Sequence, residues 1–108
     1  MAGIQRLAIY DQTTAAAFGS GNTAYTATGN YLVSVIATNT AATDAEIFVT
    51  LIPSSGSETA GALIALKLPL PAYNSYETFR FGMNNTDVIK VAGSAGIRFF
   101  VQGIEQAD

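Results

Sequence analysis

The sequence predicts an all-β protein, namely a two-sheet antiparallel β-sandwich of about eight strands with no long helix. Three observations lead to this prediction. Short segments of alternating apolar residues recur along the 108 residues, and Gly, Asn and Pro separate them at the spacing typical of sandwiches. The one alanine-rich segment is too short to form a stable helix. Jelly-roll and immunoglobulin-like topologies both fit this pattern.

The length of the chain fits one domain, residues 1–108. A chain of 108 residues can bury roughly two-thirds of its unfolded surface in one core. It is too short to form two independent cores. Within this domain, residues 1–22 are expected to contain a strand or arm that is available for assembly with a neighbouring molecule.

Two strands are expected in the N-terminal part, at residues 5–10 and 24–28. Between them, TAAAF at residues 14–18 predicts a helical turn, because alanine favours the helix. Gly19 and Gly21 end this turn before it becomes a stable helix.

The clearest strand signal is YLVSVIATNTAATDAEIFVTLIP, residues 31–53. In residues 31–38 and 47–52, successive side chains point to opposite faces, and neither face is strongly polar. Both segments are therefore expected to be central strands, or strands with one face covered by a partner. Asn39 and Asp44 bound the linker between them, and because such side chains cap turns, the linker predicts an antiparallel hairpin.

Proline bounds the next predicted strand. Residues 61–68 are expected to form a strand that Pro69 and Pro71 end, because proline cannot donate to a sheet ladder and constrains the residue before it.

The remainder of the chain contains three more predicted strands. Residues 75–81 predict a half-buried strand with Phe79 and Phe81 on the same face. Residues 87–92 predict a short strand, and residues 97–104 follow the glycine-rich turn GSAG as the last strand.

The composition indicates a neutral surface. Apolar residues make up 49% of the chain and charged residues 12%, about half the usual charged share. Weak charge repulsion and many apolar residues favour self-association or docking. The formal charge of −3 and the scattered cations argue against a nucleic-acid binder, because phosphate binding needs clustered Lys and Arg. The cations are Arg6, Lys67, Arg80, Lys90 and Arg98.

The chain offers few groups for catalysis. It contains no His and no Cys, so the usual neutral-pH general base and the common nucleophile pairs are missing. Paired carboxylates can cut glycosidic bonds, and the formal candidates are Glu58 with Glu77 and Asp44 with Glu46. The chain has no Trp to stack on sugars, so these carboxylates are better interpreted as solvated turn and strand-edge residues. We expect no enzyme.

No cofactor is expected either. Structural zinc sites need nitrogen or sulfur ligands in most cases. Calcium needs only oxygen, and the loops at Asp11, Asp44 and Asp87 supply some, but without the spacing of a calcium motif. The segments GSGN and GSAG lack the lysine and the helix of a phosphate loop and are interpreted as turns.

No membrane or export segment is evident in the sequence. The N-terminus MAGIQRLAIYDQ lacks a basic segment followed by an apolar run, and no apolar run approaches the roughly 20 residues that span a bilayer. Synthesis and assembly in a cytoplasm are therefore expected.

Three segments together resemble the small β-sandwich virion proteins of tailed bacteriophages. They are YLVSVIATNTAATDAEIFVTLIP, LPLPAYNSYETF and NTDVIKVAGSAGIRFFVQGIE. A strand that ends in an Asn-Thr turn is followed by a second apolar strand, a proline-bounded segment with an Asn-Ser turn, and a last strand that closes on Gly-Ile-Glu. The likeness covers residues 24–105 and consists of strand and turn patterns without a catalytic set.

This resemblance implies a non-enzymatic structural role in a virion that assembles in the host cytoplasm, without a nucleic-acid or membrane partner. The implied partners are the major capsid protein or tail proteins, together with copies of the chain itself in trimers or other rings. The leading expectation is a head decoration or cement protein that stabilises the capsid lattice through many weak contacts.

The contact surface is expected in the N-terminal segment and in the loops at residues 40–44, 54–61 and 69–75. The expected contact residues are Ile4, Leu7, Ile9, Thr43, Asp44, Glu58, Pro69, Pro71, Tyr73 and Tyr76.

Two other roles fit the same sequence. A neck, tail or fibre-associated protein differs from a decoration protein chiefly in copy number, because rings in a tail contain few subunits. A carbohydrate-binding module would attach the particle to a host surface through asparagines and through tyrosines such as Tyr73 and Tyr76, since tyrosine combines apolar area with one polar tip.

Overall fold

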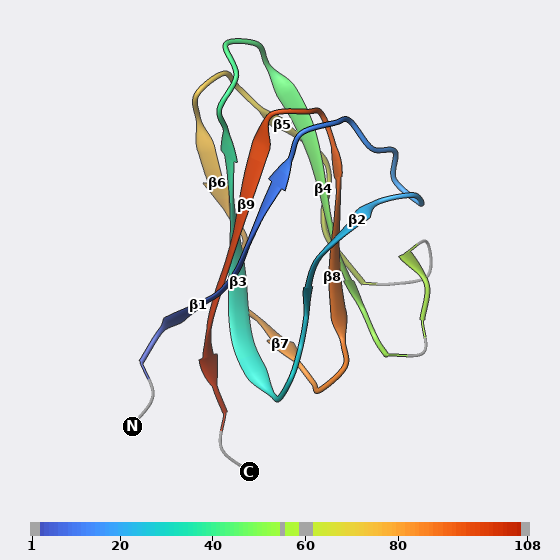
Figure 1. Cartoon of the computed structure of the whole chain (residues 1–108), viewed down its shortest axis with the longest axis vertical. Coiled ribbons are helices and arrows are strands. Elements are labelled where there is room, and N and C mark those ends of the chain that lie inside the picture. Colours follow the sequence, from blue (N-terminus) through green and yellow to red (C-terminus); the bar gives the residue numbers. More distant parts are fainter. Residues whose placement is uncertain (1–2, 55, 59–61, 107–108) are drawn as a thin grey trace.

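The structure, a computed structural model, describes residues 3–54, 56–58 and 62–106. It confirms the predicted all-β sandwich of two antiparallel sheets (Figure 1). Within these residues, no helix is long and apolar enough to cross a membrane. The strands are β1 (Gln5–Gln12), β2 (Asn22–Thr26), β3 (Tyr31–Asn39), β4 (Ala45–Ile52), β5 (Ala62–Leu70), β6 (Ser75–Glu77), β7 (Phe81–Met83), β8 (Val88–Gly93) and β9 (Ile97–Glu105).

The order of the strands decides the topology. Sheet A has the order β1-β9-β3-β6, with β7 also paired to β3, and sheet B has the order β2-β8-β4-β5. The chain crosses from one sheet to the other at every connection between these strands except β4 to β5 and β6 to β7. Figure 1 shows the two layers side by side, with sheet A on the left. This arrangement is a jelly roll, which resolves the choice between the two topologies that the sequence left open.

Side chains from the inner faces of both sheets form the core. Val33 and Val35 of β3, Ile47 and Val49 of β4, and Phe99 of β9 are 0% exposed. Their positions alternate with more exposed residues along each strand, as the period of two in the sequence predicts. Each of these side chains contributes about 1.5–3 kcal/mol through burial.

The predicted hairpin between the third and fourth strands is wrong. β3 lies in sheet A, where β9 takes one edge and β6 and β7 take the other, while β4 lies in sheet B between β8 and β5. Residues 40–44 therefore carry the chain across the sandwich. The alternation of the two strands does not separate these cases, because strands in one sheet and strands in facing sheets both turn every second side chain toward the core.

The single strand predicted at residues 75–81 is two short strands with a bulge between Glu77 of β6 and Phe81 of β7. Thr78 holds the bulge to β3: its N–H donates to the carbonyl of Val35 at 2.9 Å, and its Oγ1 accepts the N–H of Val35 at 2.9 Å. The extra residue rotates the chain. The predicted common face for Phe79 and Phe81 is therefore wrong, since Phe79 is 61% exposed and Phe81 is 8% exposed.

Pro69 does not end the fifth strand. β5 continues to Leu70, and Pro69 pairs with Glu46 of β4. An edge strand tolerates proline because the missing N–H can face away from the ladder, and β5 is the edge of sheet B. The irregularity lies earlier, where the register with β4 shifts beside Lys67, whose φ is 52°.

The helical turn predicted at residues 14–18 does not form. Ala16 instead makes a two-bond bridge with Gly93 at the end of β8, with N···O distances of 2.9 and 2.8 Å. The ring of Phe18 stacks on the ring of Phe48, with centroids 5.6 Å apart. Phe48 points away from the core, because its neighbours on β4 point inward. The β1–β2 connection therefore covers part of the outer face of sheet B.

The β4–β5 loop covers another part of that face. Thr50 and Ile52 alternate with the inward-pointing residues of β4, yet they are only 0% and 5% exposed. Gly56 lies beside Ile52 and closes a turn on the carbonyl of Pro53 at 2.8 Å. Residues 55 and 59–61 of this predicted contact loop lie outside the described residues.

Glu58 fastens the two covering segments together. Its Oε1 accepts the N–H of Gly21 at 2.8 Å, and the residue is 6% exposed. The interpretation of Glu58 as a solvated turn residue is therefore wrong, because its side chain is buried and accepts a hydrogen bond from a part-buried backbone N–H.

Candidate interaction surfaces

Two of the predicted contact loops meet at one end of the sandwich, at the top of Figure 1. Residues 40–44 join β3 to β4, and residues 71–74 join β5 to β6. Asn39 is 0% exposed and links them, because its Nδ2 donates to the carbonyls of Thr43 at 2.8 Å and Leu70 at 3.0 Å. We call this end of the molecule, residues 40–44 and 71–74, the loop end.

Further bonds hold the loop end in one shape. The Oδ1 of Asp44 accepts the N–H of Ala72 at 3.2 Å, and the N–H of Asn39 donates to the carbonyl of Asn74 at 2.9 Å. Tyr73 has a φ of 59°, a left-handed conformation that is uncommon for a residue with a side chain. It is 71% exposed. The loop end therefore presents an exposed aromatic side chain on a constrained backbone.

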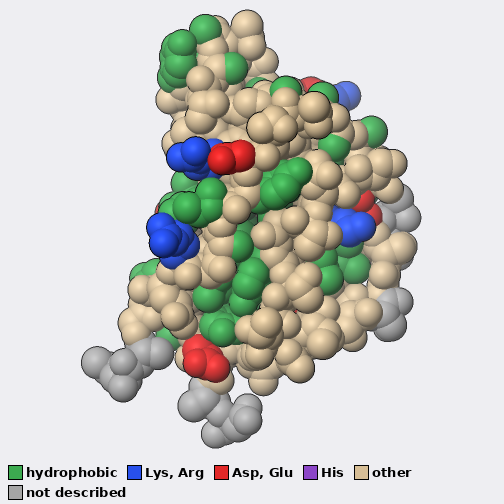
Figure 2. Space-filling model, viewed as in Figure 1, with side chains coloured by type: hydrophobic (Ala, Val, Ile, Leu, Met, Phe, Trp, Pro, Cys, Tyr) green, Lys and Arg blue, Asp and Glu red, His purple; other side chains and the backbone are tan. Residues whose placement is uncertain are grey.

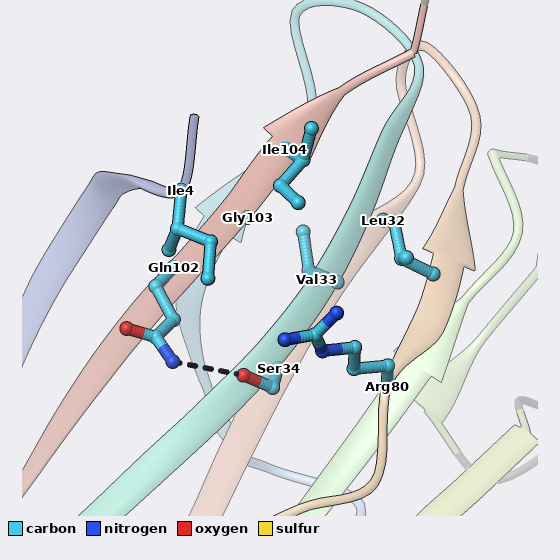
Figure 3. Close-up of a pocket in the computed structure, with 8 residues that line it drawn as sticks. All are labelled: Ile4, Leu32, Val33, Ser34, Arg80, Gln102, Gly103 and Ile104. Atoms are coloured by element: carbon cyan, nitrogen blue, oxygen red, sulfur yellow. Dashed lines mark hydrogen bonds between the residues drawn. The ribbon is translucent and has the colours of Figure 1, made fainter. Parts of the chain in front are cut away.

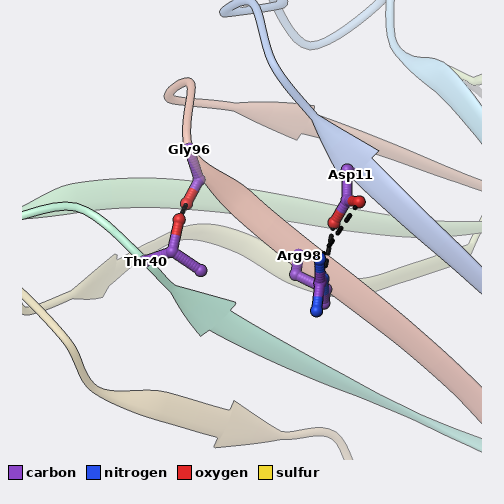
Figure 4. Close-up of polar contacts among 4 residues, drawn as sticks. All are labelled: Asp11, Thr40, Gly96 and Arg98. Carbon is purple, nitrogen blue, oxygen red and sulfur yellow. Dashed lines mark hydrogen bonds and ion pairs between the residues drawn. The ribbon is translucent and has the colours of Figure 1, made fainter.

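A cleft of about 360 Å³ lies beside the loop end. The β8–β9 turn forms one wall, and Thr40 is bound to it: its N–H and its Oγ1 both donate to the carbonyl of Gly96, at 2.9 and 2.8 Å (Figure 4). The cleft is lined by Asp11, Gln12, Thr13, Thr40, Gly96, Ile97 and Arg98.

An ion pair neutralises this cleft. The Nε of Arg98 lies 2.6 Å from Oδ1 of Asp11, and its Nη2 lies 3.3 Å from Oδ2 (Figure 4). The hydrogen bond from Arg98 lowers the pKa of Asp11, and the same bond raises the pKa of Arg98. Both side chains are more than half exposed, so solvent screens the pair and it adds little stability. In the described part of the chain, no group of three or more acidic residues is placed to hold a metal ion.

The outer face of sheet A carries a second surface, on which apolar and polar side chains alternate in rows that run across the strands. Residues in one row are direct partners in the register of β1, β9, β3 and the β6–β7 edge. The first apolar row consists of Ile9, Phe100 and Ile36, and Glu77 of β6 is the partner of Ile36 at its end. The second apolar row consists of Ile4, Ile104 and Leu32.

A polar row separates the two apolar rows. The Nε2 of Gln102 donates to Oγ of Ser34 at 3.2 Å and to Oε2 of Glu77 at 3.3 Å, and Ser34 donates to the same carboxylate oxygen at 3.1 Å. Beyond the first apolar row, the hydroxyls of Thr38 and Ser75 bond to each other at 2.9 Å. The polar groups on this face therefore satisfy one another across the strands.

A hollow of about 10 Å³ lies between the polar row and the second apolar row. Figure 3 shows Ile4 on one side of it and Arg80 on the other, with Arg80 reaching in from the bulge between β6 and β7. A volume of this size holds about one water molecule, far less than a small-molecule site needs.

The structure divides the predicted contact residues between these places. Ile4 and Ile9 lie on the outer face of sheet A, and both are large exposed apolar side chains. Thr43, Asp44, Pro71 and Tyr73 lie at the loop end, and Pro69 is exposed on β5. Leu7 and Tyr76 are half-buried against the core.

The carboxylate pair Glu58 and Glu77 is not brought together. Glu58 lies in the segments that cover sheet B, while Glu77 lies on β6 of sheet A. Tyr76 and Tyr73 do not form one platform either, since Tyr76 packs on the core. The sequence analysis missed Phe100 and Ile36 as surface residues. The feature that could have revealed them is that the strands of Phe100 and Ile36 carry apolar residues on both faces.

No family model matches this chain. A search of curated proteins found no match. Among solved structures, the chain is similar to a chain of infectious bursal disease virus, Gx strain, with a TM-score of 0.55 and 11% identity over 100% of this chain and 34% of that one. It is also similar to a chain of the T13 viral particle of the same virus, with a TM-score of 0.53 and 12% identity over 97% of this chain and 31% of that one.

These similarities show the fold and nothing more, because the identities are so low. The chain spans about a third of the virus chains that it matches. A xylan-binding domain is less similar, with a TM-score of 0.41 and 14% identity over 96% of this chain and 80% of that one.

Proposed function

We propose that this chain is a non-enzymatic structural protein of a virus particle, and specifically a decoration protein that binds the assembled lattice of a bacteriophage head. The observation that carries the proposal is the jelly-roll fold of this chain, which is similar along its length to chains from a virus particle. Fold alone does not assign a function. The resemblance of residues 24–105 to small virion proteins of tailed bacteriophages supports the same class independently.

The loop end is the proposed attachment surface. Its bonds to Asn39 and Asp44 hold it in one conformation before binding, so little conformational entropy is lost on docking. Tyr73 supplies an exposed aromatic anchor of the kind that dominates protein interfaces. A ligand that binds only the assembled lattice stabilises it by mass action, and weak contacts add up over many copies.

The test compares particles with and without the chain. Deletion of the chain should lower the temperature at which the heads release their DNA, and adding back the purified chain should restore it at a copy number close to the number of lattice positions. Equal heat resistance and no rebinding would contradict a decoration role. Rebinding in a few copies per particle would indicate the neck, tail or fibre instead.

A matched pair of variants tests the loop end. Tyr73→Ala should weaken rebinding to depleted particles, while Thr86→Ala should leave it unchanged. Thr86 is also an exposed residue with a positive φ, of 73°, but it lies in the β7–β8 turn at the opposite end of the molecule. Equal binding by both variants would remove the loop end from the proposal.

A carbohydrate-binding module is the second candidate, and the cleft beside the loop end favours it. Its volume of about 360 Å³ falls within the range of ligand pockets, and its hydroxyl, amide and paired ionic groups suit a neutral sugar. Glycan-array binding that Thr13→Val abolishes would support this candidate. An array without any bound glycan would count against it.

A further inference from the structure

We propose that the outer face of sheet A binds the same face of a second copy of the chain, with the strands of the two sheets aligned about a twofold axis parallel to them. This inference does not depend on the proposed role in a virus particle, because it concerns a surface apart from the loop end.

The two outer faces of the sandwich differ in what covers them. On sheet B, the β1–β2 connection and the β4–β5 loop bury Thr50 and Ile52. On the outer face of sheet A, neighbouring side chains bury Ser34, which is 3% exposed, but Ile4 is 56% and Ile9 is 46% exposed. Figure 2 shows hydrophobic and basic side chains together along the left side of the molecule, where β1 and β9 lie. Exposed apolar side chains gathered on one face favour an interaction site there.

The pattern of rows favours a second copy as the occupant. A twofold axis parallel to the strands places each row on itself and reverses the order of the strands. The first apolar row, Ile9, Phe100 and Ile36, then meets its own copy, and the polar rows meet each other. Such a self-complementary patch is what an isologous interface requires. Two sheets that pack face to face keep their strands within about 30° of each other, which this axis allows.

The charges complement each other across the same axis. Arg6 lies on β1 at one edge of sheet A, and Glu77 lies on β6 at the other edge, with β9 and β3 between them. Three strand spacings, about 14 Å, separate them in one molecule, which is too far for an ion pair. The reversed strand order brings Arg6 of one copy over the β6–β7 edge of the other. There the carboxylate of Glu77 is bonded to Ser34 and Gln102, and Arg80 lines the adjoining hollow. Glu77 uses Oε2 in both of its bonds, so Oε1 can accept the guanidinium of a second copy.

The distribution of cations supports an interface here. Arg6 and Arg98 point outward from sheet A, and Arg80 lines the hollow on the same face. Lys67 and Lys90 belong to strands of sheet B. Protein interfaces are enriched in arginine and depleted in lysine. Every arginine of the chain therefore lies on the proposed surface.

The size of the face indicates how strong the contact is. Four strands of up to nine residues span about 30 by 19 Å, or about 600 Å² from each copy. The total, about 1,200 Å², lies at the lower end of specific interfaces. The dimer is therefore expected to dissociate on dilution, so its formation can be followed by concentration.

Sedimentation velocity of the full-length chain over a range of concentrations tests the proposal. A reversible dimer is expected. Arg6→Glu and Glu77→Arg should each raise its dissociation constant by about tenfold or more, and the double variant should restore most of the loss because the charges are exchanged. Lys67→Glu is the matched control, since it makes the same charge change at an exposed residue of sheet B. It should leave the dissociation constant unchanged.

A variant in the first apolar row tests the dimer separately from the charges. Ile9→Asp should abolish the dimer without depending on the ion pair, and circular dichroism should confirm that each variant is folded. A chain that stays monomeric at every concentration would overturn the proposal, as would a dimer that tolerates Ile9→Asp and Arg6→Glu. Single variants that weaken the dimer without rescue in the double variant would overturn the twofold arrangement.

Discussion

The two outer faces of this sandwich differ in how far their apolar side chains are covered by the rest of the chain. Both sheets carry apolar side chains on the side away from the core. Sheet B buries Ile52 and stacks Phe48 beneath segments of its own chain. The described residues leave Ile9 exposed on sheet A. An apolar outer position therefore predicts that something covers it, but it does not say whether the cover is part of the same molecule.

The largest expected effect concerns Gly93 of sheet B, which pairs with β4 and is also bridged to Ala16 of the covering segment. Gly93 has a φ of 119°, and a Cβ there would overlap the carbonyl oxygen of Glu46. Gly93→Ala should destabilise the fold by about 3 kcal/mol or more, because left-handed strain adds to the overlap. Gly82→Ala on β7 of sheet A is the control, since a Cβ there meets nothing within 4 Å. If urea unfolding shows that Gly93→Ala and Gly82→Ala lower the free energy of unfolding equally, the expected difference between the two positions is wrong.

The next effect compares one apolar residue from each outer face. Ile52→Ala should cost about 2–4 kcal/mol, because it leaves a cavity beneath the β4–β5 loop. Ile9→Ala should cost less than about 1 kcal/mol in dilute solution, where the chain is monomeric and the side chain is half in water. Thermal unfolding at low concentration measures both. A large loss for Ile9→Ala would mean that the face of sheet A is already covered within the monomer.

A smaller effect of opposite sign is expected at Thr50. Its hydroxyl is buried on the covered face and has no hydrogen-bond partner among the described residues. Thr50→Val should stabilise the fold by about 1 kcal/mol, because it removes an unsatisfied polar group at nearly constant volume. Thr38→Val on the outer face of sheet A should not stabilise it, since its hydroxyl bonds to Ser75. A loss of stability in Thr50→Val would indicate that the hydroxyl is satisfied.

The smallest effect concerns the exposed ion pair of Asp11 and Arg98. Because the pair lowers the pKa of Asp11 in the folded state, its contribution is present above the ordinary carboxyl pKa of about 4 and is lost as the pH falls below it. Asp11→Asn should leave the urea midpoint at pH 7 unchanged within error and make the loss of stability between pH 5 and pH 3 slightly shallower. A clear drop at pH 7 would mean that solvent screens this pair less than its exposure indicates.

Much of the fold could be predicted because alternation is a local signal. The third, fourth and ninth strands of the structure lie close to residues 31–38, 47–52 and 97–104, where apolar side chains recur every second residue. The single strand predicted at residues 75–81 is wrong at Thr78. There a side-chain bond to Val35 replaces one backbone pair, and the chain bulges. A bulge depends on a partner strand more than forty residues away, so local pattern does not reveal it.

The candidate surfaces were predicted in part. Thr43 and Tyr73 lie in loops as predicted, because turn chemistry marks a loop directly, while their role in contacts stays a prediction. Glu58 was placed wrongly, since a carboxylate in a polar loop resembles a solvated one until Gly21 is brought against it. Phe100 and Ile36 were missed as a surface because strand alternation does not say which of two apolar faces looks inward.

The sequence by itself determined the all-β class, most strand positions, the low charge and the lack of thiol and imidazole chemistry, because these follow from composition and from neighbours in the chain. The tertiary structure alone decided which strands pair, which of the two sandwich topologies forms and which outer face stays open. Those outcomes depend on pairs such as Gln5 with Gly103, which meet only when the whole chain has folded. A period of two records that a residue points inward or outward, and it carries no information on what lies opposite.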